Sequence, residues 1–144
     1  MDYELMTKHI LYEFNVSRRY IAYDYIVYGI HLMETDKKCI EHITKNLYLD
    51  IADKYHTTSI CVERVIRTTL ENIWRNQADN KELIIKVFGK ECLSYRPTNT
   101  MFFQMLFDYI TTYASGCRAA ECPFYGCSYC AVTKNGVQKT FKNF

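Results

Sequence analysis

The sequence is poor in the residues that interrupt regular structure, since its 144 residues include only two prolines and five glycines. This scarcity argues against a disordered or linker-rich chain, and a hydrophobic share of 49% is enough for one packed domain. Long hydrophobic runs are also absent. None approaches the roughly 20 residues that cross a bilayer, and no charged leader followed by a hydrophobic segment opens the chain. We therefore expect a cytoplasmic protein with no membrane partner.

The sequence also lacks an excess of one charge, because its formal net charge is only +2. A value this small excludes nucleic-acid affinity driven by the charge of the whole molecule, so any such contact must come from a local patch. Glycine-rich phosphate loops, paired carboxylates and nucleophile–base arrangements are missing too, and the four histidines are scattered. We expect a binding protein, neither an enzyme nor a receptor for a small-molecule substrate.

Helical periodicity dominates the chain before residue 115, where no convincing strand pattern occurs. We expect the second helix to begin near Ser17 and to carry a stripe of apolar residues that faces the core. Gly29, on the same helix, would allow close contact with another helix. The predicted stripe consists of Ile21, Tyr25, Tyr28 and Leu32. The predicted helical segments are residues 2–14, 17–34, 37–45, 47–55, 58–76 and 81–88, and a last helix capped by Thr98 or Asn99.

The most informative segment is Tyr48–Arg67, whose apolar residues suit two short helices that meet at a tight turn. Ile51 and Ala52 lie on one helical face, the period breaks at residues 56–58, and Val62 and Ile66 resume it. The hydroxyl of the threonine at position 58 is a suitable cap for the second helix. This pattern predicts a helix-turn-helix.

The opposite face of the second helix carries side chains that can reach base edges and phosphates in a major groove. These are Ile60, Glu63, Arg64, Arg67 and Glu71. The same arginines also fit a different interpretation, in which they are solvated and pair with the glutamates at i, i+4 spacing. Such a pair is worth only about 0.2–0.5 kcal/mol.

The segment Ile43–Trp74 resembles the effector domain family of stage zero sporulation protein A, the sporulation response regulator. The similarity extends from about Leu11 to about Ile110. Its most specific features are the TTxxxVERxIR run at Thr57–Arg67 and the PTN loop at Pro97–Asn99, in that order.

The resemblance implies an all-α fold, a compact bundle of about six helices with a recognition helix at about residues 59–75. It implies a sequence-specific regulator of transcription that binds short double-stranded DNA boxes in promoters, as a homodimer on tandem sites. Family members carry a receiver domain that controls dimerisation. This sequence lacks the alternating strand and helix pattern of a receiver, so we expect no aspartyl phosphorylation switch within it.

By position, Glu63, Arg64 and Arg67 match the recognition helix of the family. The sequence departs at Ile60 and Cys61, where the family usually has a polar residue and an arginine. Two interpretations stay open: an altered target with Ile60 on a thymine methyl, or a protein-interaction module that modulates a full-length regulator without reading DNA itself. The candidate DNA-binding residues are Lys54, Thr58, Ser59, Ile60, Glu63, Arg64, Arg67, Arg96 and Asn99.

We expect the segment 115–144 to be a separate, irregular, Cys-rich tail that follows a domain at residues 1–114. Its thiols at Cys117, Cys122, Cys127 and Cys130 suit a tetrahedral zinc, although only the last pair has the usual short spacing. An iron–sulfur site and unliganded thiols are the alternatives. Zinc is thus a possible cofactor of the tail, and no cofactor is expected in the rest of the chain.

Overall fold

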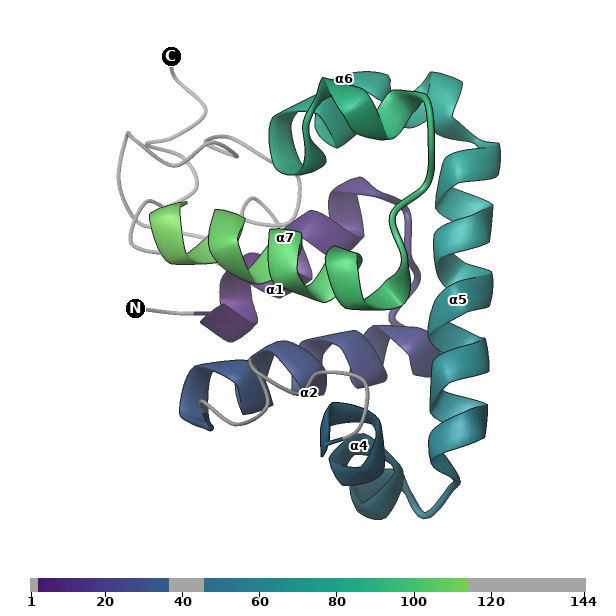
Figure 1. Cartoon of the computed structure of the whole chain (residues 1–144), viewed down its shortest axis with the longest axis vertical. Helices are drawn as coiled ribbons and strands as arrows, with labels where there is room; N and C mark the ends of the chain where they lie inside the picture. Colours follow the sequence, from purple (N-terminus) through teal and green to yellow (C-terminus); the bar gives the residue numbers. More distant parts are fainter. Residues whose placement is uncertain (1–2, 37–45, 114–144) are drawn as a thin grey trace.

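The computed structural model describes residues 3–36 and 46–113, and within these ranges the chain is all-α with no strand. Figure 1 shows the arrangement: α7 crosses the centre of the molecule, α2 and α4 lie below it, α6 lies above it, and α5 runs along one side. The elements are α1 (Tyr3–Glu13), α2 (Ile21–Thr35), α4 (Tyr48–Tyr55), α5 (Ser59–Arg75), α6 (Gln77–Phe88), the 3-10 helix η2 (Lys90–Leu93) and α7 (Asn99–Tyr113). The predicted helical bundle is confirmed.

The core is built around α7, whose inward side chains recur every three or four residues. Phe102, Phe103, Leu106 and Ile110 are each no more than 1% exposed. The Phe102 ring packs at 5.5 Å from the ring of Phe88 on α6, and at 5.7 Å, edge to face, from the ring of Phe103. α7 contacts α1, α2, α5 and α6, so its buried side chains join these four helices in one core.

The predicted close contact at Gly29 is confirmed. A Cβ atom on this residue would lie only 2.8 Å from Cε1 of Phe103 and 3.4 Å from Cδ1 of Ile51. Since the absence of a side chain lets the phenyl ring lie directly on the α2 backbone, α2 and α7 can approach more closely than other residues would allow.

The prediction for the start of α2 is wrong, because the helix begins at Ile21 and not near Ser17. The Ser17 hydroxyl instead accepts a hydrogen bond from the Arg19 amide at 3.1 Å, which stabilises a local turn. The predicted core stripe is also shifted, since Ile21 is 44% exposed. The buried residues of α2 are Ala22, Tyr23, Tyr25, Ile26, Gly29, Ile30 and Met33.

The start of α6 was also predicted incorrectly, because the helix begins at Gln77 and not at Lys81. The asparagine-rich composition predicted a turn, but only Asn76 leaves helical geometry, with φ −102° and ψ 31°. Asn80 is 7% exposed, and its side-chain amide donates to the Asn76 carbonyl at 3.4 Å. Tertiary burial therefore overrides the local preference of these residues for a turn.

No helix in the described ranges is both long enough and apolar enough to span a bilayer. The predicted helix at residues 37–45 and the Cys-rich tail, with its four candidate metal ligands, lie outside the described residues. Among the residues that the structure describes, no three His, Cys, Asp or Glu side chains are grouped to hold a metal. The domain boundary and the zinc site stay predictions, and metal analysis of the purified protein would test the latter.

Candidate nucleic-acid interface

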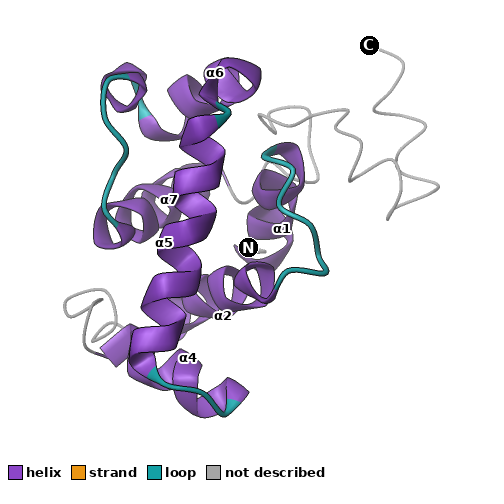
Figure 2. Cartoon of the chain, turned by 90° about the vertical axis from the view of Figure 1, so that its right-hand side faces the viewer, coloured by secondary structure: helices purple, strands orange, loops and turns teal. Residues whose placement is uncertain are grey.

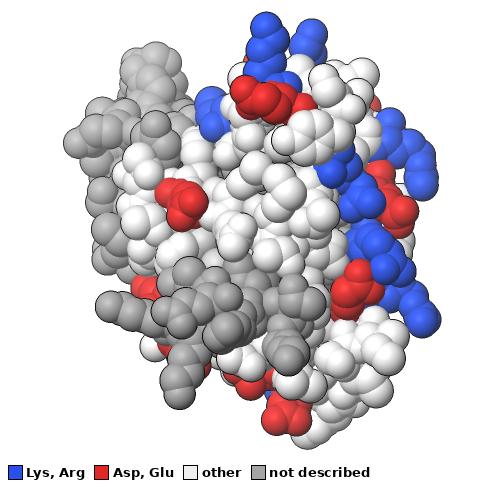
Figure 3. All heavy atoms as spheres, viewed as in Figure 1, with Lys and Arg blue, Asp and Glu red and all other residues white. Residues whose placement is uncertain are grey.

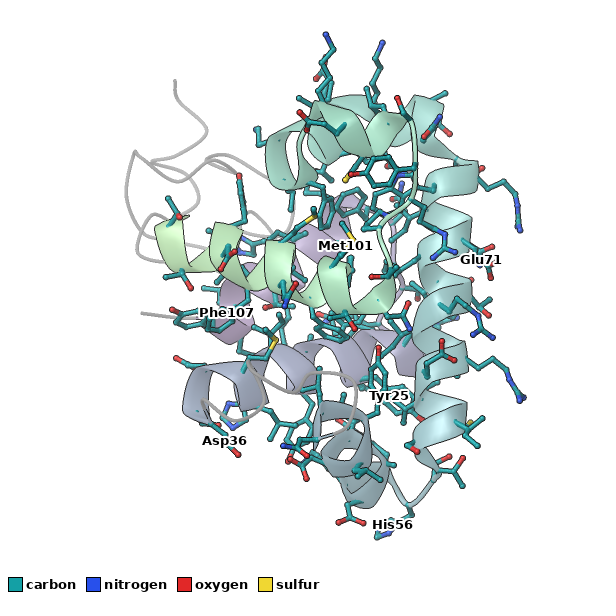
Figure 4. All side chains as sticks on the ribbon, in the orientation of Figure 1. Tyr25, Asp36, His56, Glu71, Met101 and Phe107 are labelled. Atoms are coloured by element: carbon teal, nitrogen blue, oxygen red, sulfur yellow. The ribbon has the colours of Figure 1, made fainter. Side chains whose placement is uncertain are left out.

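The turn between α4 and α5 is stabilised at its start by its own backbone. His56, at the tip of the turn in Figure 4, adopts a left-handed conformation with φ 55° and ψ 49°. The amides of His56 and Thr57 both turn back to the Ala52 carbonyl, the latter at 3.0 Å. This geometry ends α4 and reverses the chain within three residues, so the predicted helix-turn-helix is confirmed.

The first turn of α5 is capped by a side chain. Thr58 has an extended backbone, and its Oγ1 accepts a hydrogen bond from the Cys61 amide at 3.1 Å. The cap satisfies one of the amides that a helix N-terminus leaves without a partner. The start of the predicted recognition helix at Ser59 is confirmed and is locally stabilised.

The Thr58→Ala variant is expected to lower the free energy of unfolding by about 1 kcal/mol, because it removes this cap. Urea denaturation of the full chain measures the change. Thr57→Ala is the matched control, since the neighbouring hydroxyl has no hydrogen bond to a described residue, and its effect should stay within about 0.5 kcal/mol. Equal losses for both variants would contradict the capping role.

The two sides of α5 differ sharply. Its inner side packs into the core through Val62, Ile66, Leu70, Ile73 and Trp74, each at most 8% exposed. Its other side, here called the outer stripe, consists of the exposed residues Ile60, Arg64, Arg67, Thr68, Glu71 and Arg75. Figure 2 shows α5 running down the front of the molecule from α6 to α4, and Figure 4 shows Glu71 pointing away from the body of the domain.

Two long-range contacts fix the orientation of α5. Near its C-terminal end, the Trp74 indole Nε1 donates to the Cys92 carbonyl at 2.7 Å, and the indole packs at 5.5 Å from the Phe88 ring. Near its N-terminal end, Asn99 Nδ2 donates to the Glu63 carbonyl at 3.0 Å. Because both anchors lie on the inner side, the outer stripe stays open along the helix.

The structure shows which residue of the PTN loop caps α7 and where Asn99 lies. Thr98 caps α7, since its Oγ1 accepts from the Met101 amide at 3.2 Å and its carbonyl accepts from the Phe102 amide. Asn99 is 8% exposed, and its Oδ1 has no hydrogen-bond partner among the described residues. Asn99 is therefore directed inward, and its position supports α5 from behind instead of presenting a group on the outer stripe.

The Asn99→Ala variant is expected to lower the free energy of unfolding by about 1–2 kcal/mol, because a buried bond between α7 and α5 is lost. Asn72→Ala is the control: among the described residues its exposed side-chain amide bonds only to the Arg75 guanidinium, at 2.9 Å, so its effect should stay within about 0.5 kcal/mol. Denaturant unfolding compares the two variants. A loss at position 99 no greater than at position 72 would mean that the buried bond does not hold α5.

The two arginines predicted to contact DNA are in different electrostatic situations. Arg67 Nη1 donates to both carboxylate oxygens of Glu63, at 2.8 and 2.9 Å, so the predicted i, i+4 pair is present. Arg64 is exposed and has neither a hydrogen bond nor an ion pair within the described part of the chain. In Figure 3, cationic and anionic side chains alternate down the edge where α5 lies. Arg64 is thus the more available of the two cations.

Two tyrosines on the packed side of the motif remain neutral at physiological pH. Burial raises the pKa of Tyr48; the Asn99 side chain opposes this rise by hydrogen bonding, and the Glu63 carboxylate adds to it. Burial also raises the pKa of Tyr25, and Cys61 adds to this increase. These phenols therefore contribute no charge behind α5.

The remaining candidate residues lie at the start of α5, on α4 and in the loop before α7. Ser59, the first residue of the helix, is half-buried. Lys54 is exposed in the last turn of α4, and its ammonium lies 4.8 Å from the centre of the Tyr28 ring. Arg96 is half-buried in the loop before α7, where its Nη1 donates to the Pro97 carbonyl at 3.4 Å. Contact of these side chains with DNA stays a prediction.

Two members of the outer stripe, Thr68 and Arg75, were not among the residues predicted to lie on the exposed side of this helix. Both are exposed. They continue the spacing of three or four residues that begins at Ile60, so the helical period was the signal that would have found them. The outer stripe is consequently longer than the sequence interpretation proposed.

Comparison with known families places the chain beside a family of regulators. The family model described as sporulation initiation factor Spo0A, C-terminal, matches residues 7–110. The match includes α4, the turn, α5 and the PTN loop, and it ends within α7.

Proposed function

Since the chain belongs to the Spo0A C-terminal family, whose members are DNA-binding effector domains, we propose that it is a sequence-specific regulator of transcription that reads promoter DNA through the outer stripe of α5. The site supports binding and not catalysis. The proposal includes action in the cytoplasm, where bacterial promoters are accessible, and occupation of tandem sites by two copies.

The observation that carries this proposal is the exposed, mixed polar side of a capped helix at the edge of the fold. α5 has 17 residues, a length of about 25 Å, and a major groove about 12 Å wide accepts one α-helix. N-terminal residues of a recognition helix approach the base edges, whereas its more distal residues approach phosphates. The anchors at Trp74 and Asn99 leave this side of α5 free to enter the groove.

Each arginine of the outer stripe suits a particular partner in DNA. Arg64 can donate two hydrogen bonds to O6 and N7 of guanine, a contact worth about 1–3 kcal/mol of discrimination. Arg67 is oriented by Glu63, which leaves its other guanidinium nitrogens available to a phosphate or a base. Arg75, at the far end of the helix, is suited to a phosphate contact that sets the register.

Selection of duplexes from a randomised pool with the full chain tests this function. We expect enrichment of a short sequence that contains guanine, and retardation of that duplex in a gel that weakens as salt increases. Failure to enrich any sequence, together with no retardation at low salt, would reject the proposal.

A second candidate function is a protein-interaction module that retains the fold and modulates a full-length regulator. Two exposed apolar side chains of the motif favour it: Ile60 on α5 is 69% exposed and Leu49 on α4 is 56% exposed. A stable complex with a full-length regulator, in a chain that binds no DNA at low salt, would support this alternative over the first.

A further inference from the structure

Ile60 is the most exposed large hydrophobic side chain in the described part of the protein, at 69% of its surface. It is the second residue of α5, directly within the turn that the Thr58 hydroxyl caps. A β-branched side chain on a capped helical turn has few rotamers, so its two apolar branches have a defined direction. The cap thus presents a rigid hydrocarbon group at the leading end of the outer stripe.

A hydrocarbon group can recognise only one feature of the major groove. Guanine, adenine and cytosine present hydrogen-bond donors and acceptors there, whereas thymine adds a 5-methyl group beside its O4 acceptor. An isoleucine placed on a polar base edge removes water from that edge without replacing its hydrogen bonds, which is unfavourable. Contact between Ile60 and a thymine methyl group instead buries apolar surface on both partners.

The position of Ile60 relative to Arg64 sets where this thymine lies. Four residues of helix rise by about 6 Å, and base pairs are stacked about 3.4 Å apart. The two side chains are on the same side of α5, since both belong to the outer stripe. On a DNA duplex these two side chains would therefore reach base pairs that are about one or two steps apart.

We propose that Ile60 is a specificity-determining residue that selects thymine through its 5-methyl group, one or two base pairs from the guanine read by Arg64. The proposal rests on the proposed DNA-binding function.

Replacement of thymine by deoxyuridine tests this inference, because it removes the methyl group and keeps every hydrogen-bonding atom of the base. Each thymine of the selected duplex is replaced in turn, and affinity for the full chain is measured by fluorescence anisotropy. At one position we expect a loss of about threefold to fivefold, the effect of one buried methyl group. The Ile60→Ser chain should bind the thymine and deoxyuridine duplexes equally at that position.

Leu49→Ser is the matched control, since Leu49 is also an exposed apolar residue of the motif but lies on α4. This variant should keep the preference for thymine. Duplex binding without any effect of deoxyuridine, or an effect that persists in Ile60→Ser, overturns the role of Ile60 and leaves the DNA-binding function intact. Absence of duplex binding by the unmodified chain at low salt overturns the proposed function itself, and with it this inference.

Discussion

The Arg64→Ala variant is expected to bind the selected duplex about 10- to 100-fold more weakly than the unmodified chain. Arg64 is exposed and has no ion pair with a described residue, so its guanidinium can make a bidentate contact with guanine without first breaking another bond. Loss of that contact removes both affinity and discrimination at one base pair. Anisotropy titrations with the selected duplex and with a duplex altered at that guanine measure the two effects.

Arg67→Ala is expected to have a smaller effect on affinity than Arg64→Ala. In the free protein the Arg67 guanidinium already bonds to Glu63, so part of its interaction with DNA is offset by weakening of this pair. The double variant Arg64→Ala/Arg67→Ala should lose most specific binding. If Arg67 contacts a phosphate, its removal lowers the slope of log affinity against log salt by about one.

The control for this series removes two positive charges elsewhere. Lys81 on α6 and Lys90 on η2 are exposed and lie outside the outer stripe. The variant Lys81→Ala/Lys90→Ala has the same net charge as the double arginine variant, but we expect its affinity to change by less than about threefold. Similar losses for both double variants would show that overall charge, and not the outer stripe, determines binding.

Phe103→Ala is expected to destabilise the fold by about 3–5 kcal/mol, the largest change in stability predicted for this protein. The ring is completely buried and covers the α2 backbone at Gly29, so truncation leaves a cavity at the centre of the bundle. Urea denaturation measures the loss. Phe107→Ala is the control, because this half-buried ring stacks on Tyr3 at 5.3 Å near the surface and its removal should cost clearly less.

The contact between Phe103 and Gly29 also predicts non-additive behaviour. Gly29→Ala alone is expected to cost about 1–3 kcal/mol, since the new Cβ would lie 2.8 Å from the ring. In Gly29→Ala/Phe103→Leu the clash is relieved, so the double variant should lose less than the sum of the single losses. If Phe103→Ala does not fold, the Leu variants still provide this comparison, and strict additivity would contradict the proposed packing.

The sequence predicted α5 and the helix-turn-helix well because most of the inner residues of these helices are apolar and most of the outer ones are polar. α2 was harder to predict, since apolar residues occupy most of its circumference and several stripes fit the same period. The start of α6 depends on burial of Asn80, which is a tertiary effect. Local patterns cannot report such effects.

In the candidate site, too, some features follow from the local sequence and others depend on tertiary contacts. Helical spacing was sufficient to place Arg64 and Arg67 on the exposed side of α5. The bond from Asn99 to the Glu63 carbonyl joins residues 36 positions apart in the sequence, so no local pattern could predict that this candidate faces inward. The pairing of Arg67 with Glu63 was open at the level of sequence, and only the geometry distinguishes it from the unpaired Arg64.

Mapping the bound surface by amide chemical shifts would test the central claim most directly. The full ¹⁵N-labelled chain is titrated with the selected duplex, and a duplex of scrambled sequence is the control. We expect the largest shifts specific to the selected duplex at Ser59–Arg75, in the residues of the outer stripe, with smaller changes on α6 and η2. Specific shifts centred on another surface, with the outer stripe unaffected, would contradict DNA recognition by α5.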